Sequence, residues 1–361
     1  MRELLGDLAG AWRAGERAGL ATVTATWSSA PRQPGAAMLV RADGTALGSV
    51  SGGCVEGAVY ELCREVAESG EPRTVRFGVA DDDAFAVGLP CGGTIELFVE
   101  RAGFPEVDVL AAEVAADRPV ALLTGVAGPA RGHHLVLTPG ERYGSLGGDT
   151  IDAAAAENGR ALLAAGHTGL VRLEPGTAVL VTSFPPAARM LVFGATDHAA
   201  AVARIGSFLG YRVTVCDARP VFATARRFPG AAEVVTGWPH RYLAAEATAG
   251  RVDGRTVVCV LTHDPRFDVP VLQVALRLPL AYVGAMGSRR THDDRLARLR
   301  EAGLDAAALG RLCSPIGLDL GARTPEETAV SVAAEIVALR RHGTGERLSG
   351  TSGPIHGGGM I

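Results

Sequence analysis

The chain carries a paired glycine followed by a cysteine, Gly52-Gly53-Cys54, between an apolar run at 37–40 and a helix-forming run at 55–67. Glycine has no Cβ atom, so Gly52 and Gly53 can adopt positive φ and bring main-chain N–H groups close to a ligand. The following helix directs its partial positive end at the same point, where an anion or a thiolate is stabilised. The segment therefore predicts either an anion site with a chemically active Cys54, or a helix cap with a small buried cysteine.

The same turn occurs a second time in the chain. The segment 39–54 is similar to 135–149, where the two glycines are kept and Asp149 stands in place of Cys54. The match extends upstream, with 22–26 aligned to 120–124, and downstream, so the copies cover about 20–77 and 118–173. A repeat of this length is typical of two halves packed as one domain. Because the glycines recur and the cysteine does not, we expect the turn to be structural and Cys54 to be chemical.

A second cysteine is also flanked by glycines. Cys91 precedes Gly92-Gly93 and an alternating segment at 94–100 that predicts a strand. Cys91 could meet Cys54 in one pocket as a catalytic partner, or it could be a turn residue beside the strand. The residues leave both interpretations open.

The composition of the chain excludes several classes of function. The chain has 361 residues and a net charge of −4, with no basic tract typical of nucleic-acid binding and no apolar run of about 20 residues that could span a membrane. The N-terminus has acids where a secretory signal needs apolar residues, so we expect a cytoplasmic protein. The cysteines lack C-x-x-C spacing, and no lysine is present, which excludes a Walker A loop and Schiff-base chemistry. Anions must be bound by arginines and main-chain N–H groups.

From residue 189 the pattern changes to that of a mononucleotide-binding half. A strand at 190–193, a turn at Gly194, a helix to about 209 and a strand at 211–216 that ends in Asp217 follow one another. Gly194 and Asp217 are therefore candidate cofactor-binding residues. Thr196 and Ala199 replace the second and third glycines of the fingerprint, and the β-branched Thr196 obstructs a pyrophosphate. The pattern predicts the fold and leaves NAD(P) binding doubtful.

The loop after a later strand carries a second set of candidate anion ligands. A strand is predicted at 280–283, followed by Gly284, Gly287, Ser288 and Arg289 before a helix. Ligands of open α/β sheets bind beyond the carboxyl ends of the strands, and a helix N-terminus with an arginine can hold a phosphate. Together with Gly52 and Gly53, these residues are predicted to form an anion cradle between two domains.

Four motifs of the chain resemble the XdhC/CoxI family of xanthine dehydrogenase accessory factors; they lie at 48–56, 88–93, 282–291 and 314–327. The resemblance covers nearly the whole chain. It implies an N-terminal XdhC/CoxI-type α/β domain at 1–186, which contains the repeat, a Rossmann-like parallel-sheet domain at 187–342, and a tail at 343–361 that we expect to be disordered.

The resemblance also implies a function. Family members bind the molybdenum cofactor, support its sulfuration with a cysteine desulfurase, and insert it into an apo molybdenum hydroxylase of the xanthine or carbon monoxide dehydrogenase type. On this basis we expect a cofactor carrier rather than a turnover enzyme, acting as a homodimer, with Cys54 as molybdenum ligand or persulfide carrier and Cys91 as its partner. The alternatives are an NAD(P)-dependent oxidoreductase and a protein that recruits the dehydrogenase without touching the cofactor.

Overall fold

The computed structural model describes residues 1–27, 32–78, 93–174 and 176–352. Within these ranges the chain forms two compact units, Met1–Pro186 and Ala187–Gly350. The first unit is a duplicated α/β domain and the second has a parallel sheet flanked by helices, as predicted. The strands of the first unit pair antiparallel, which the sequence analysis did not specify. Of the predicted tail, Leu348–Gly350 forms a short 3-10 helix, η3.

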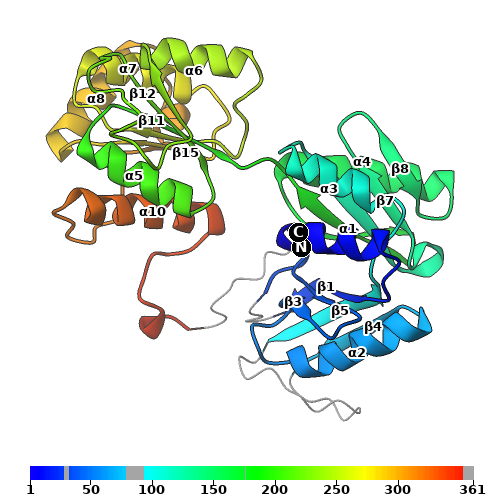
Figure 1. Ribbon diagram of the computed structural model, residues 1–361. Helices are drawn as coiled ribbons and strands as arrows, with labels where there is room; N and C mark the ends of the chain where they lie inside the picture. Colours follow the sequence, from blue (N-terminus) through cyan, green and yellow to red (C-terminus); the bar gives the residue numbers. More distant parts are fainter. Residues whose placement is uncertain (28–31, 79–92, 175, 353–361) are drawn as a thin grey trace. The chain divides into compact units, whose positions relative to one another are not determined.

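The first unit is built from two copies of one arrangement of strands and helices (Figure 1). Its sheets have the strand orders β3-β2-β1-β5-β4 and β8-β7-β6-β10-β9, so every strand of one has a counterpart in the other. The first copy contains η1 (Arg2–Leu4), α1 (Leu5–Arg13), β1 (Gly19–Trp27), β2 (Ala37–Val40), β3 (Ala46–Gly48), α2 (Glu56–Ser69), β4 (Arg73–Phe77) and β5 (Thr94–Arg101). The second contains α3 (Val107–Ala115), β6 (Val120–Ala127), η2 (Gly128–Ala130), β7 (His134–Leu137), β8 (Arg142–Ser145), α4 (Asp149–Ala165), β9 (Gly169–Glu174) and β10 (Thr177–Phe184).

Strand pairing in the two sheets shows that the repeat extends beyond its predicted ends. It also shows that the predicted alignment of the two copies is wrong. The glycine before the turn packs on the carbonyl oxygen of Ala37 in the first copy and of His134 in the second. Ala37 pairs with Thr22, and His134 pairs with Thr124, so Thr22 and Thr124 are counterparts. The predicted alignment, which placed Thr26 opposite Thr124, is wrong by four residues. An even shift keeps every side chain on the same face of a strand, so the apolar pattern could not reveal the error.

The two sheets pack face to face, and the helices α2 and α4 cover their outer faces (Figure 1). Between the sheets, Phe98 of β5 contacts a cluster with Val126 of β6 and Leu180 of β10. Helices α1 and α3 close another part of this interface. Burying each large apolar side chain stabilises the unit by about 1.5–3 kcal/mol, which holds the two copies together as one domain.

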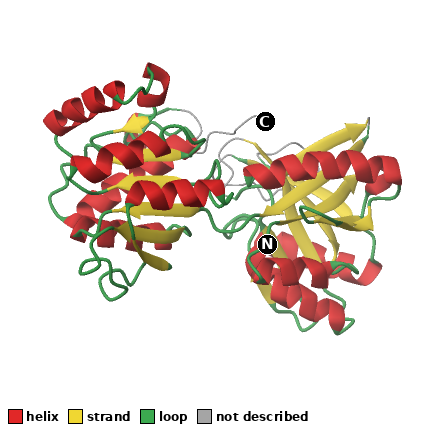
Figure 2. Cartoon of the chain, turned by 90° about the horizontal axis from the view of Figure 1, so that it is seen from above, coloured by secondary structure: helices red, strands yellow, loops and turns green. Residues whose placement is uncertain are grey.

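The second unit has one six-stranded parallel sheet with the order β13-β12-β11-β14-β15-β16. Figure 2 shows helices on both sides of this sheet. Helices α5 and α10 pack on one face, and α7 and α8 lie on the other. The elements are β11 (Arg189–Phe193), α5 (Asp197–Phe208), β12 (Arg212–Asp217), β13 (Glu233–Thr236), α6 (Pro239–Thr248), β14 (Val257–Val260), α7 (Pro265–Ala275), β15 (Tyr282–Ala285), α8 (Arg289–Glu301), α9 (Ala306–Leu309), β16 (Leu312–Cys313) and α10 (Pro325–Arg341).

Local sequence signals explain where the last helix of this unit begins. Thr324 caps α10 and Glu327 completes the capping box, as predicted.

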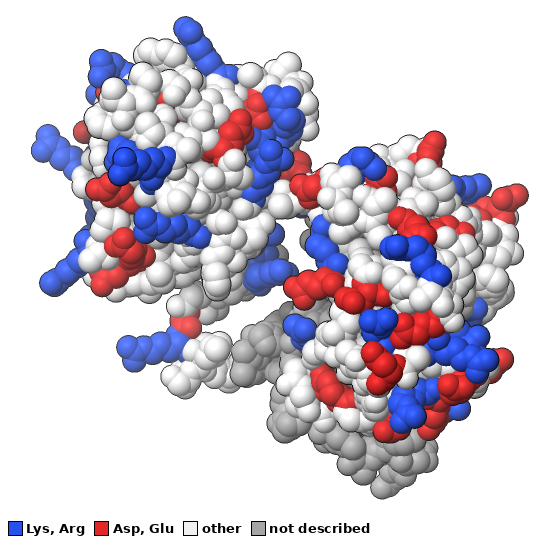
Figure 3. Space-filling model, viewed as in Figure 1, with Lys and Arg blue, Asp and Glu red and all other residues white. Residues whose placement is uncertain are grey.

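The surface of each unit is mixed in charge, because arginines and acidic residues are interspersed on the faces seen in Figure 3. Over the described ranges, no helix combines the length and the apolar character that crossing a membrane requires.

Candidate functional site

The predicted anion cradle at Gly52 and Gly53 is occupied by a side chain of the protein itself. Both glycines have positive φ, +78° and +119°, as the sequence predicted. Their N–H groups donate to the carboxylate of Glu56, at 3.0 Å from Gly52 and 2.8 Å from Gly53. The N–H of Ser51 donates to the same carboxylate at 2.9 Å, and the hydroxyl of Ser49 at 2.6 Å. The loop therefore wraps around a carboxylate that lies in the first turn of α2.

Ser51 holds two further N–H groups immediately before the helix. Its hydroxyl accepts hydrogen bonds from the N–H groups of Cys54 and Val55, both at 3.0 Å, and donates to Glu56. These bonds satisfy donors that the helix itself leaves open. The prediction that the N–H groups of Gly52 and Gly53 face a ligand is thus wrong for this structure, because internal acceptors already hold them.

The environment keeps Glu56 ionised. Burial alone would raise the pKa of this carboxyl, but hydrogen bonds from Ser49 and Ser51 outweigh burial and lower the pKa to about 2. The negative charge then faces the partial positive end of α2, which stabilises it. The sequence contained the signal, since an acid in the first helical turn after two glycines can fill the cradle that they open.

The second copy uses a carboxylate in the corresponding way. Asp152, in the first turn of α4, is buried and accepts a hydrogen bond from the N–H of Leu146 at 2.6 Å. Asp149, which replaces Cys54, begins α4 with a fully exposed side chain. A glycine turn with a carboxylate that accepts from a nearby main-chain N–H group is therefore common to both copies, although the N–H of Gly147 donates to the hydroxyl of Ser145 instead. The cysteine belongs to the first copy alone.

Cys54 lies two residues before α2, partly buried against the core beneath that helix, and its thiol is free. Burial raises the pKa of the thiol of each of the other four described cysteines, to about 12 for Cys63 and Cys216 and about 11 for Cys313, and it raises that of Cys259 also. Those thiols stay protonated at neutral pH and are poor nucleophiles.

The predicted partner of Cys54, Cys91, lies outside the described residues, as does Gly92. The described ranges contain no group of three or more His, Cys, Asp or Glu side chains that could together hold a metal ion.

In the second unit, Gly194 and Asp217 lie at the carboxyl ends of neighbouring strands. Contacts within the protein explain the presence of each residue. A Cβ atom on Gly194 would lie 3.0 Å from the backbone of Leu261, and its φ is +113°, so only glycine fits there. Asp217 accepts from the N–H of Ala195 at 2.7 Å and from the guanidinium of Arg219 at 2.8 and 2.9 Å. Both carboxylate oxygens are thus occupied where a ribose would bind in a dinucleotide site. Although burial opposes ionisation, the bonds to Arg219 lower the pKa of Asp217.

The N-terminus of α5 is also capped internally. The hydroxyl of Thr196 accepts from the N–H of Ala199 at 3.2 Å. In a dinucleotide site, the pyrophosphate would interact with N–H groups at this helix end. The Thr196 side chain therefore occupies an N–H group of the protein that a pyrophosphate would otherwise use.

The predicted loop after β15 begins later than expected. Gly284 belongs to the strand and is buried, and a Cβ there would lie 2.6 Å from Ile316 and from the hydroxyl of Tyr282. Close packing thus explains this glycine, which is not part of an open loop. Gly287 is in the loop with φ +154°, and the Ser288 hydroxyl caps α8 by accepting from the N–H of Thr291 at 3.1 Å.

Arg289 and Arg290 form the first turn of α8 and are exposed. Neither guanidinium has an ion pair or hydrogen bond to any residue in the described ranges. Cations at a helix N-terminus are electrostatically unfavourable unless an anion compensates them. These two side chains therefore remain candidates for binding a phosphate, as the sequence analysis expected.

A buried ion pair that no sequence pattern predicted holds this loop. Arg295 of α8 and Asp268 of α7 are 3% exposed and 3.0 Å apart, and Asp268 also accepts from the hydroxyl of Thr262. Arg295 donates to the carbonyl of Met286 at 2.7 Å and to the hydroxyl of Ser314 at 2.9 Å. Burial raises the pKa of Asp268 to about 6, against the pull of Arg295. No local pattern marks this contact, because its residues come from separate elements.

Comparisons with known proteins agree with this architecture. Residues 190–336 match the model of the XdhC Rossmann domain, and residues 11–78 match the model of the XdhC and CoxI family. The chain is 30% identical over 332 residues to the molybdenum cofactor insertion chaperone PaoD of Escherichia coli strain K12, covering 91% of this chain and 85% of that protein. It is 28% identical over 335 residues to a probable xanthine dehydrogenase subunit of Bacillus subtilis strain 168, covering 90% and 94%.

A solved structure shares the fold. The crystal structure of a protein described as a xanthine dehydrogenase from Bacillus halodurans superposes with a TM-score of 0.68 and covers 97% of both chains. Its sequence identity to this chain is 24%, so the likeness concerns the fold alone.

Proposed function

Because this chain belongs to the XdhC and CoxI family, we propose that it binds the molybdenum cofactor and inserts it into an apo molybdenum hydroxylase of the xanthine or carbon monoxide dehydrogenase type. The similarity to a molybdenum cofactor insertion chaperone over most of both chains supports this role. The observation that carries it is the position of Cys54, a free and partly exposed thiol on a loop held by Glu56 and Ser51.

Cys54 supplies the sulfur chemistry of the proposal. Its loop is fixed by hydrogen bonds to two serines and one carboxylate, so the thiol is presented at a defined position. A thiolate there binds molybdenum in the cargo, or carries a sulfur atom as a persulfide that a cysteine desulfurase has loaded. Cys91, as a second sulfur residue, is the proposed partner in this transfer.

Arg289 and Arg290 supply the anion recognition of the proposal. Molybdopterin carries a phosphate, and arginine guanidinium groups suit phosphate through charged, bidentate hydrogen bonds. The N-terminus of α8, which Ser288 caps and Gly287 precedes, adds a favourable dipole for that anion. Gly52, Gly53 and Gly284 act in this proposal through the shape of the backbone, since the N–H groups of Gly52 and Gly53 donate to Glu56 and Gly284 is buried in β15.

Assembly and partners are part of the same proposal. We place an apo molybdenum hydroxylase and a cysteine desulfurase as successive partners, and a homodimer as the working form. The alternative role of an NAD(P)-dependent oxidoreductase is disfavoured by the bonds of Asp217 to Arg219 and Ala195, which leave no free carboxylate oxygen for a ribose.

The test is retention of the cofactor by the purified full chain. The protein is incubated with molybdenum cofactor, desalted, and analysed for molybdenum and pterin. Wild type is expected to retain both, and Cys54→Ser to lose most of the molybdenum. Cys313→Ser is the matched control, since it removes another partly buried thiol whose raised pKa makes it unreactive, and it is expected to retain the cofactor.

The remaining outcomes separate the competing roles. Equal retention by wild type and Cys54→Ser would refute the role of Cys54 while keeping the carrier function. No retention by wild type, together with a stable complex with the apoenzyme, would favour recruitment alone. Saturable binding of reduced nicotinamide by wild type would instead favour the oxidoreductase.

A further inference from the structure

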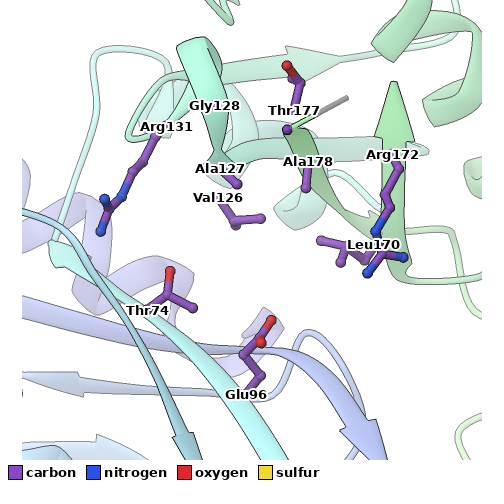
Figure 4. Close-up of a pocket in the computed structure, with 11 residues that line it drawn as sticks. Thr74, Glu96, Val126, Ala127, Gly128, Arg131, Leu170, Arg172, Thr177 and Ala178 are labelled. Carbon is purple, nitrogen blue, oxygen red and sulfur yellow. The ribbon is translucent and has the colours of Figure 1, made fainter. Parts of the chain in front are cut away.

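A cavity of about 660 Å³ opens between the two sheets of the first unit. Thr74 of β4 and Glu96 of β5 line it from one sheet, and Val126, Arg131 and Arg172 line it from the side of the other (Figure 4). Both halves of the repeat therefore contribute to one cavity. None of the candidate residues considered above lines it, so the proposed function does not account for it.

A comparison of the two copies of the repeat shows that, among the described residues, an arginine at this cavity lacks the acidic partner that its counterpart has. The β4–β5 ladder pairs Arg76 with Glu96, and the β9–β10 ladder pairs Arg172 with Ala178 at the corresponding positions. In the first copy the Nη2 atom of Arg76 lies 3.1 Å from a carboxylate oxygen of Glu96. In the second copy alanine has replaced that acid, and Arg172 has no ion pair or hydrogen bond within the described part of the chain.

A second arginine at the cavity also lacks a carboxylate partner. Arg131 donates to the carbonyl oxygen of Pro72 at 2.6 Å, and no described acidic residue pairs with it. Glu96 is already compensated, because its other oxygen accepts from the hydroxyl of Thr24 at 3.2 Å while Arg76 neutralises its charge. Among the described residues, the cavity therefore has two guanidinium groups without a carboxylate partner, and such groups favour an anion.

The rest of the lining favours an apolar body on that anion. Val126, Leu170 and Ala178 present apolar side chains, and the buried cluster with Phe98 and Leu180 lies behind them. Alanine at position 178 also leaves free the space that the longer acid occupies in the first copy. The lining thus offers apolar surface between the sheets with cationic groups beside it.

We propose that this cavity is a binding site for a small aromatic anion, a flat ring system that bears one phosphate or carboxylate. The ring lies against Val126 and Leu170, and the charged group pairs with Arg172 and Arg131. The site is independent of the carrier role, because it uses neither Cys54 nor the arginines of the second unit.

The test is a fluorescence titration of the full chain with naphthyl phosphate, naphthoate and neutral naphthol. We expect saturable binding of at least one of the two anions, and binding of naphthol weaker by about tenfold, the value of one hydrogen bond to a charged group. The stronger of the two anions identifies the charged group that the site prefers. Arg172→Gln and Arg131→Gln are each expected to weaken anion binding by about tenfold.

Two further variants make the result specific. Ala178→Glu restores in the second copy the acid of the first, so it should pair with Arg172 and abolish anion binding, in a setting that the repeat already tolerates at Glu96. Arg160→Gln removes an exposed arginine from α4, on the opposite side of the sheet, and should leave binding unchanged. The proposal is overturned if wild type binds neither anion saturably, or if Ala178→Glu binds as wild type does. Retention of molybdenum cofactor, measured separately, reports on the carrier role.

Discussion

The carboxylate of Glu56 accepts a hydrogen bond from the main-chain N–H of Gly53 at 2.8 Å. A glycine turn before a helix is commonly an anion site for a ligand, and here the protein supplies the anion from the first turn of the same helix. The consequence is a rigid loop that presents Cys54 and does not depend on a ligand for its shape. The energetics of this loop can be tested directly.

Replacing Glu56 by glutamine should destabilise the first unit. The neutral amide is a weaker acceptor and brings its own donors toward the N–H groups of Ser51, Gly52 and Gly53, so we expect a loss of about 1–3 kcal/mol in the free energy of unfolding. Urea denaturation of the full chain measures it. Glu61→Gln, exposed on the same helix, should change stability by less than about 0.5 kcal/mol. Equal stability of both variants would contradict the role of Glu56.

The same carboxylate should make stability dependent on acid. Its folded-state pKa of about 2 lies below the ordinary value of 4.5, so its stabilising effect is complete above about pH 5 and is lost as the pH falls from 4.5 toward 2. The difference in unfolding free energy between wild type and Glu56→Gln should therefore shrink from pH 7 to pH 3. A difference that stays constant over this range would show that the ionised form is not what the loop stabilises.

Removing the acid of the buried ion pair should be more damaging. Asp268→Asn leaves the charge of Arg295 buried without a carboxylate, which costs about 3–5 kcal/mol in comparable cases. Thermal unfolding should show the transition of the second unit shifted to lower temperature, with that of the first unit unchanged. Asp293→Asn, which removes an exposed acid from α8, is the control and should leave both transitions in place.

Alkylation should distinguish Cys54 from the buried cysteines. Cys63 and Cys216 have a thiol pKa of about 12, and neither side chain is accessible to reagent, so both should stay unmodified in the native protein at pH 8. Cys54 should react with iodoacetamide before either of these two, as followed by mass spectrometry of peptides over time. Full modification in denaturant provides the control. Modification of Cys63 before Cys54 would contradict the accessibility that the proposed function requires.

Much of the fold could be predicted because its signals are local. The strand, turn, helix and strand that end at Asp217 follow one another along the chain, and the capping box at Thr324 lies within four residues. The glycine turns marked the repeat because Gly52 and Gly53 need positive φ, a condition that few other residues meet. The β1 strand was misaligned with β6 because alternation of apolar residues looks the same after an even shift.

The order of residues alone was enough to locate the backbone turns, to show a tandem repeat followed by a parallel-sheet unit, and to set Cys54 apart from its counterpart Asp149. The groups that bind the main-chain N–H groups and carboxylates near those turns became apparent only in the folded chain. Glu56 takes the N–H groups that a ligand was expected to use, and Arg219 takes the carboxylate of Asp217. That Arg172 lacks the acidic partner of its counterpart Arg76 likewise appears only when the two ladders are compared over the described residues. Hydrogen bonds and ion pairs depend on distances between side chains, and folding sets those distances across elements that are far apart along the chain.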